Sequence, residues 1–198
     1  LLSVDMDLLS SAVAWPDNGL LYVAHYGMGT GTSARGVELT NGTEIQGGLT
    51  VVAEGSLYIN GDYNTVNKKG AAVIADAVNL LSNSWDGSKS AGNLPVASET
   101  TYNTAIVTGN TTTTLGSYNG GLENLPRFHE KWTTKKCNIN GSFVNAWESR
   151  YADADWNYGG AYYKAPKRKW YYDEMFNNVE NLPPYTPMVV SASDIVRW

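Results

Sequence analysis

The sequence predicts a mainly β fold, with a short parallel β-solenoid over about residues 20–114 followed by a small α+β segment. The prediction depends on three short β-prone runs, at residues 49–52, 56–59 and 72–81, which Gly, Asn and Asp residues separate. In these runs apolar side chains are spaced so that they can point to a common interior while polar ones face outward. These apolar positions are Val51, Leu57, Ile59, Val73, Val78 and Leu80. Stacked coils of a solenoid bury such residues in one shared core.

An antiparallel sandwich is the competing fold. Asn41-Gly42 and Asn60-Gly61 are dipeptides that commonly form tight hairpin turns. A hairpin sheet leaves one polar face on every strand, whereas solenoid coils stack in parallel and close on a common core. Because the sequence repeat is loose, the sandwich stays open as an alternative.

The N-terminal part of the chain alternates turns with short β-prone runs. Residues 1–14 have the pattern of a short helix with Ser3 as a candidate N-cap, and a strand fits them almost as well. The turn at residues 15–19 leads into a β-prone run at residues 20–24. The closely spaced glycines at residues 27–31 are not followed by a helix pattern, so they predict a surface loop and not a dinucleotide site.

The second half of the chain contains one predicted helix among further extended segments. Threonine and valine at residues 98–114 favour extended structure. Residues 122–132 predict the helix because their apolar side chains recur at helical spacing. His129 lies beside that apolar stripe and is predicted to be a partly buried or surface histidine. Residues 138–147 resemble a β-hairpin that turns at Asn140-Gly141.

Aromatic and proline residues dominate the C-terminal part. An aromatic stretch covers residues 151–176, and prolines then make the approach to a final strand at residues 188–190 extended and stiff. These elements predict a solenoid region with its N-terminal lead-in at residues 1–115. The α+β segment at residues 116–198 is predicted to pack on it, with its helix beneath the aromatic strands.

Composition places the chain among folded proteins with a low charge content. The 198 residues include 42% apolar and 17% charged residues, whereas an average soluble domain has about 25% charged residues. Polar surface must come from Asn, Ser, Thr, Gly and Tyr, which suits a secreted β protein. No stretch approaches the about 18 apolar residues of a membrane span. We therefore expect an extracellular protein without a span in this chain.

Charge is unevenly distributed along the sequence. The formal net charge is −5. Residues 1–100 contain four basic and ten acidic side chains, whereas residues 101–198 contain ten basic and nine acidic ones. An acidic first half argues against a general nucleic-acid binder and leaves a local basic patch in the second half open.

Few residues have the pattern of a metal or catalytic site. Cys137 is the one cysteine, so it cannot form an internal disulfide, and it is predicted to be a small buried apolar residue. Asp153 and Asp155 offer oxygen ligands of the kind that bind calcium, but the segment lacks the Gly and the distal Glu of an EF-hand loop. A glycosidase needs two carboxylates held about 5 to 10 Å apart, and the sequence does not show that convergence. We therefore predict no catalytic residue and no required cofactor.

An aromatic and basic cluster is the candidate ligand-binding surface. Aromatic side chains can stack against sugars or unpaired bases while lysines and arginines contact phosphates. The alternative is that the aromatic residues belong to the core and the cations to a solvated turn. The residues of the cluster are Trp156, Tyr158, Tyr162, Tyr163, Lys164, Lys167, Arg168, Lys169 and Trp170.

Several long phrases resemble, in the same order, the C-terminal region of the PilX-type, pilin-like family of bacterial envelope proteins. The phrases are GLTVVAEGSLYINGDYNTVNKKGAAVIADAVNLLSNSW, YNGGLENLPRFHEKW, NGSFVNAWESRYADADW, YYKAPKRKWYYDEMF and NLPPYTPMV. The resemblance implies a cleavable leader and a long apolar N-terminal helix ahead of a β-solenoid exterior domain. That leader and helix are not among these 198 residues. We therefore expect either that the chain was cut from a longer one or that a partner supplies the helix.

The resemblance implies a non-enzymatic exterior domain at the bacterial cell surface, in filament structure, pilus assembly or adhesion. Its expected partners are other pilin-like subunits, or a pilin helix supplied in cis or in trans. Two alternatives assign a role to particular residues of the chain. One is a β-helix that binds or cleaves polysaccharides through Asp153, Asp155 and the neighbouring aromatic residues. The other is a DNA receptor at a pilus tip that uses Lys167, Arg168 and Lys169.

Overall fold

The computed structural model describes residues 1–11, 15–24, 36–89, 92–109, 126–146 and 163–188. These residues form a mainly β structure of three sheets, in which every strand pair is parallel. The prediction of a mainly β chain is confirmed. The antiparallel sandwich with hairpins at Asn41-Gly42 and Asn60-Gly61 is wrong, because the strands on either side of these turns pair with other, parallel neighbours.

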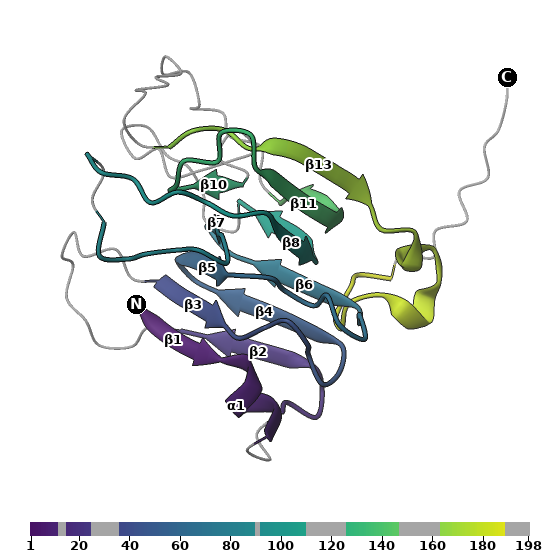
Figure 1. Ribbon diagram of the computed structural model, residues 1–198. Helices are drawn as coiled ribbons and strands as arrows, with labels where there is room; N and C mark the ends of the chain where they lie inside the picture. Colours follow the sequence, from purple (N-terminus) through teal and green to yellow (C-terminus); the bar gives the residue numbers. More distant parts are fainter. Residues whose placement is uncertain (12–14, 25–35, 90–91, 110–125, 147–162, 189–198) are drawn as a thin grey trace, which may run out of the picture.

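Two of the sheets have five strands each. The first has the order β1 (Leu2–Asp5), β3 (Gly36–Thr40), β5 (Ser56–Asn60), β7 (Ala77–Leu81) and β10 (Arg127–Phe128). The second has the order β2 (Leu20–Val23), β4 (Leu49–Ala53), β6 (Ala71–Ile74), β9 (Ala105–Thr108) and β12 (Phe143–Asn145). Each passage of the chain thus adds one strand to the first sheet and then one to the second. Figure 1 shows the resulting layers, from β1 and β2 at the bottom through β3 and β4 to β5 and β6.

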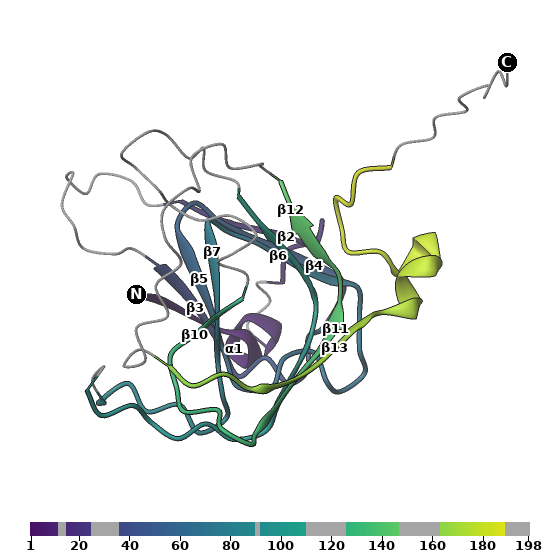
Figure 2. The ribbon, with the colours of Figure 1, turned by 90° about the horizontal axis from the view of Figure 1, so that it is seen from above.

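The third sheet is formed by later parts of the chain. It consists of β8 (Thr100–Asn103), β11 (Lys136–Gly141) and β13 (Lys167–Tyr172), with β11 in the centre. In the view from above, β11 and β13 lie on a different side of the interior from both β5 and β4 (Figure 2). Strands from both sides of the predicted division at residues 115 and 116 share all three sheets, and the division itself lies outside the described residues.

Aliphatic side chains stack in rows across the sheets and form the core. Val37, Leu57 and Val78 are in-register neighbours in the first sheet, and each is fully buried. Val51, Val73 and Ile106 form the equivalent row in the second sheet. Burial of one such side chain contributes about 1.5–3 kcal/mol. The alternation that the sequence predicted at these positions is confirmed.

Several local predictions were wrong or only partly right. Residues 72–81 form two strands and not one, since β6 ends at Ile74 and β7 begins at Ala77. The first residues form both a strand, β1, and a short helix, α1 (Met6–Ser11). Asp5, and not Ser3, caps that helix, because Asp5 Oδ1 accepts hydrogen bonds from the N–H groups of Asp7 and Leu8 at 3.0 and 3.1 Å.

The predicted helix at residues 122–132 is wrong over its described part. Residues 127–128 form β10, which extends the first sheet, and residues 129–132 continue in non-helical backbone. The predicted hairpin at Asn140-Gly141 is also wrong. β11 and β12 do not pair with each other, because β11 lies between β8 and β13 while β12 pairs with β9. Of the predicted final strand, residues 189–190 lie outside the described residues.

The chain leaves β13 through a segment without strands, residues 173–188, which we call the C-terminal strap. It contains the 3-10 helices η2 (Glu174–Asn177) and η3 (Val179–Asn181), followed by Pro183, Pro184 and Pro187. The strap lies to the outside of the second sheet, where it appears in yellow in Figures 1 and 2. In the described part of the chain, each helix is too short or too polar to cross a membrane.

Candidate functional site

The structure describes six of the nine residues predicted for the ligand-binding surface. Trp156, Tyr158 and Tyr162 lie outside the described residues, as do Asp153 and Asp155 of the predicted calcium site. The other six residues lie on β13 or just before it, and they are Tyr163, Lys164, Lys167, Arg168, Lys169 and Trp170. The described part of the candidate surface therefore lies at β13, next to the strand that pairs with it, β11.

The parallel pairing of β13 with β11 determines which side chains share a face. Cys137 and Ile139 of β11 point into the core, and their partners on β13 are Arg168 and Trp170. The alternate residues of β13, Lys167, Lys169 and Tyr171, lie on the outer face, next to Lys136, Asn138 and Asn140 of β11. The predicted cluster is therefore divided between two faces of one strand.

Trp170 and Tyr163 pack against the hydrophobic core. The Trp170 ring lies 5.4 Å from the Phe143 ring, and the Arg168 guanidinium lies 5.1 Å from the Trp170 centroid. Tyr163 stacks on Phe128 with ring centroids 6.1 Å apart. Both aromatic residues are partly buried against the core. For these two residues the structure supports the alternative that the sequence left open, in which the aromatic side chains belong to the core.

The lysines of the predicted cluster are joined by three lysines from the preceding passage of the chain. Lys131 is the bridge partner of Lys164, and Lys136 is the in-register neighbour of Lys167. The Lys167 N–H donates to the Lys135 carbonyl oxygen at 2.8 Å. All six side chains are exposed. We call this group the basic surface, and it consists of Lys131, Lys135, Lys136, Lys164, Lys167 and Lys169.

Sequence reasoning missed Lys131, Lys135 and Lys136. These lysines stand in the phrase HEKWTTKKC, which was assigned to a helix and its end. A signal was nevertheless present, since lysines recur at similar spacing in HEKWTTKKC and in YYKAPKRKW. Two such phrases on adjacent parallel strands place their cations side by side.

An apolar groove lies between the second sheet and the C-terminal strap. Its volume is about 430 Å³. The sheet contributes the outward-facing Ala72, Ile74, Ala105, Val107 and Val144, and the strap contributes Phe176, Leu182 and three prolines. Ile74, Val107 and Val144 are in-register neighbours, so they form an aliphatic row on the outside of the sheet. An aliphatic row that stays partly open to solvent marks a candidate interaction surface.

Three glycines allow the strap to approach the sheet closely. Gly19, Gly48 and Gly70 each stand directly before a strand of the second sheet. A Cβ atom on Gly70 would lie 2.8 Å from the Leu182 carbonyl oxygen, and one on Gly19 would lie 2.6 Å from Pro184 Cγ. Real Cβ atoms do not make such contacts, so the strap position requires glycine at residues 19 and 70. A Cβ atom on Gly48 would lie 3.3 Å from Pro184, which is a tight contact but not an excluded one.

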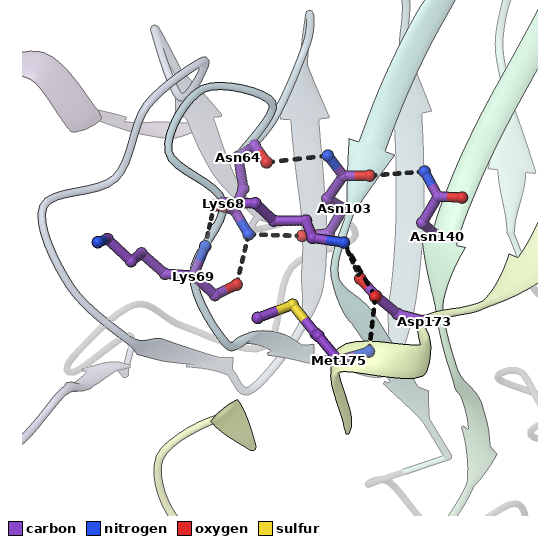
Figure 3. Close-up of polar contacts among 7 residues, drawn as sticks. All are labelled: Asn64, Lys68, Lys69, Asn103, Asn140, Asp173 and Met175. Atoms are coloured by element: carbon purple, nitrogen blue, oxygen red, sulfur yellow. Dashed lines mark hydrogen bonds and ion pairs between the residues drawn. The ribbon is translucent and has the colours of Figure 1, made fainter. Parts of the chain in front are cut away.

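A polar network fixes the other end of the strap, as Figure 3 shows. Asp173 accepts hydrogen bonds from Lys68 Nζ at 2.7 and 2.9 Å and from the Met175 N–H at 3.2 Å. Nearby, Asn103 donates from Nδ2 to the Asn64 carbonyl oxygen and accepts from Asn140 Nδ2. The C-terminal strap, which forms one wall of the groove, is therefore held at both of its ends.

Glu130 and Ser82 form a fully buried polar pair. Glu130 accepts from the Ser82 N–H at 2.7 Å and from the Ser82 hydroxyl at 2.6 Å. The Ser82 oxygen in turn accepts from the N–H groups of Ser84 and Ser98. Burial raises the pKa of Glu130, and the two bonds from Ser82 oppose that rise. Through these hydrogen bonds the buried pair connects Ser84 with Ser98.

His129 lies on the outer side of the first sheet, and it is partly buried as predicted. Its Nε2 lies 2.8 Å from Asn79 Oδ1, and the rings of Tyr58 and Trp85 flank it. Asn79 donates from Nδ2 to the carbonyl oxygens of Leu57 and Ala77, so its Oδ1 accepts from the histidine. Burial lowers the pKa of His129, with Arg127 adding to the effect.

Cys137 is buried as predicted and has no disulfide partner. Burial raises its pKa to about 12. Over the described ranges, no three His, Cys, Asp or Glu side chains come close enough together to hold a metal ion.

Comparison with known proteins gives no further assignment, since no protein-family model, curated protein or solved structure matches the chain.

Proposed function

We propose that the chain is a short parallel β-solenoid that serves as the non-enzymatic exterior domain of a pilin-like bacterial surface protein. Support for the solenoid comes from the order of the strands. Each passage of the chain contributes to the first sheet and then to the second, and Val37, Leu57 and Val78 recur at the same depth in successive passages. Stacking of this kind is how a solenoid builds one continuous core.

The apolar groove is the observation that carries the proposed role. An exterior domain of a pilin-like protein must hold an apolar helix, either its own or that of a neighbouring subunit. Helix-in-groove recognition needs a row of aliphatic side chains between two walls. Ile74, Val107 and Val144 provide the row, and the C-terminal strap provides the second wall. Val144 is 45% exposed and Tyr185 is 62% exposed, so both are open to a partner.

The proposed location is the bacterial cell surface. It is supported by the resemblance to PilX-type proteins and by a composition rich in Asn, Ser, Thr and Gly with few charges. The proposed role is in filament structure, pilus assembly or adhesion, with other pilin-like subunits as partners.

The test is to find the protein in filaments and to disrupt the groove. Filaments sheared from cells that express the full-length gene should contain this chain, as detected by immunoblotting and immunogold labelling. Val144→Asp should remove the chain from the filaments, because a carboxylate in the groove opposes an apolar helix. Val66→Asp is the matched control, since Val66 is also 45% exposed but lies outside the groove.

The two variants give opposite outcomes if the groove is the docking surface. Val66→Asp should stay in the filaments at the wild-type level, and both variants should melt within a few degrees of the wild type. Equal retention of Val144→Asp and Val66→Asp would exclude the groove. Absence of the wild-type chain from sheared filaments would exclude the exterior-domain function itself.

A further inference from the structure

The basic surface places like charges side by side on neighbouring strands. Lys136 and Lys167 are in-register partners, and Lys131 and Lys164 are bridge partners. Neighbouring strands are about 4.8 Å apart, and like charges at such positions repel each other. A turn closed by the Lys135 N–H on the Trp132 carbonyl oxygen, at 2.7 Å, brings the two lysine pairs together. The folded protein therefore holds these two pairs of like charges near each other, at an electrostatic cost.

The described residues offer little negative charge to offset that cost. Among them, the one ion pair of the basic surface joins Lys136 to Glu99 at 3.3 Å, and both side chains of this pair are about half exposed. Exposed pairs of this kind contribute little. The basic surface also contrasts with the acidic net charge of the chain. A polyanion that follows β13 would remove the repulsion between the lysines and gain their attraction.

Tyr171 adds an aromatic face to the basic surface. It follows Lys167 and Lys169 at alternate positions of β13, so all three side chains lie on the outer face of the third sheet. Tyr171 is 59% exposed. Cations beside an exposed aromatic ring are the elements that bind single strands of nucleic acid, because phosphates meet the cations while a base stacks on the ring.

We propose that the basic surface binds a single-stranded nucleic acid, with its lysines at the phosphates and Tyr171 stacked on a base. This binding is a function beyond the proposed docking of an apolar helix, and it uses a different face of the molecule. A single strand fits better than a duplex because only an unpaired base is free to stack on Tyr171. An acidic polysaccharide would satisfy the lysines but has no aromatic base for the ring.

The first measurement is the binding of fluorescein-labelled oligo-dT of 15 nucleotides to the whole chain, followed by fluorescence anisotropy between 50 and 200 mM salt. Contacts to four to six phosphates predict a slope of log K against log salt of about −3 to −4. Affinity should then fall by roughly 50- to 300-fold over this range of salt. Absence of salt-dependent binding at 50 mM salt would overturn the proposal.

The second measurement separates the basic surface from overall charge. Lys167→Glu/Lys169→Glu should weaken binding at least tenfold and flatten the salt slope by about 1.4, since two phosphate contacts are lost. Lys69→Glu/Lys89→Glu changes the net charge equally, with both lysines exposed and outside the basic surface. An equal loss in both double variants would reject the basic surface as the binding site. Lys167→Gln/Lys169→Gln removes repulsion without adding carboxylates, and it keeps the test valid if the glutamate variant fails to fold.

The third measurement tests stacking at constant charge. Tyr171→Ala should weaken oligo-dT binding about fivefold or more, the range found for loss of one base–aromatic contact. Tyr22→Ala is the control, because Tyr22 is similarly exposed but lies on β2, outside both the basic surface and the groove. Fluorescent polygalacturonate should bind more weakly than oligo-dT at the same charge concentration. Equal binding of both polymers, with no effect of Tyr171→Ala, would assign the surface to acidic polysaccharides and overturn the nucleic-acid proposal.

Discussion

Lys68 Nζ donates hydrogen bonds to both carboxylate oxygens of Asp173, at 2.9 and 2.7 Å, across 105 residues of sequence. The Asp173 side chain is only 7% exposed, whereas that of Lys68 is 35% exposed. Asp173 also accepts from the Met175 N–H and so caps η2. One carboxylate therefore joins the loop between β5 and β6 to the start of the C-terminal strap (Figure 3).

Lys68→Met should loosen the strap. The change leaves the buried Asp173 carboxylate with the Met175 N–H as a donor but without its cation. We expect a loss of about 1–2 kcal/mol in unfolding free energy, a moderate value because the lysine is partly solvated. Hydrogen exchange of residues 174–188, followed by mass spectrometry, should become faster. Lys69→Met is the control, because the neighbouring Lys69 side chain is exposed. Equal exchange rates in the two variants would show that the ion pair does not hold the strap.

Gly70→Ala should push the strap away from the second sheet near Asn181 and Leu182. The new Cβ would meet the carbonyl oxygens of Asn181 and Leu182, and backbone atoms cannot yield as a flexible side chain can. We expect a loss of at least about 1–3 kcal/mol in unfolding free energy and faster proteolysis within the strap. Gly92→Ala has no heavy atom within 4 Å of its new Cβ and should leave both measurements unchanged. A strap as protected in Gly70→Ala as in Gly92→Ala would contradict this packing.

Asn103→Ala should destabilise the fold through the asparagine row in Figure 3. The change removes the Asn103 side chain as the hydrogen-bond partner of the Asn64 carbonyl oxygen and of the Asn140 side-chain amide. Unsatisfied buried polar groups cost about 1–3 kcal/mol each, and Asn64 is fully buried. Urea unfolding should show a lower midpoint with an unchanged slope. Asn145→Ala, at an exposed position of β12, should stay within about 0.5 kcal/mol of the wild type.

The sequence predicted the strands whose packing depends on local alternation. β4 and β5 lie where residues 49–52 and 56–59 predicted them, because core-facing Val51, Leu57 and Ile59 alternate with residues that face away from the core. The prediction of a helix at residues 122–132 was wrong because Phe128 and Trp132 reach the core from extended backbone. Pairing of β10 with β7 determines this conformation, whatever the local spacing of apolar residues. The conformation of such a segment depends on contacts with a strand that is distant in sequence, and a short stretch of sequence does not show these contacts.

The candidate surfaces were predictable only in part. Lys164, Lys167 and Lys169 were recognised from their clustering in sequence. Their neighbours Lys131 and Lys136 become neighbours only through parallel pairing across more than thirty residues. The apolar groove depends on the strap lying against Gly48 and Gly70, and the chain reaches these glycines from more than a hundred residues away. Such contacts are set by topology rather than by composition.

Cys137 should be unreactive in the folded protein. Burial raises its pKa to about 12, so only about one thiol in ten thousand is ionised at pH 8. Ellman's reagent at pH 8 should label less than a tenth of the thiol in an hour without denaturant. In urea it should label one thiol per chain, because the sequence has one cysteine. Rapid labelling of the native protein would mean that the β11–β13 pair opens readily.

Glu130 should make stability depend on pH in the opposite sense to an ordinary surface carboxylate. Burial raises its pKa above the ordinary value of 4.5. The folded state therefore binds a proton more readily than the unfolded state. This contribution to stability is fully present below the unfolded pKa, and it is lost as the pH rises through the higher folded pKa.

Glu130→Gln isolates that contribution, since glutamine keeps the shape but does not titrate. Unfolding free energies from urea titrations at pH 5 and pH 7 should differ between wild type and variant. The wild type should gain stability relative to Glu130→Gln on going from pH 7 to pH 5. Carboxylates such as Asp5 and Asp86, whose pKa values are lowered, change both proteins equally and cancel in the comparison. A relative loss on acidification would mean that the Ser82 bonds outweigh burial and that Glu130 is held as a carboxylate.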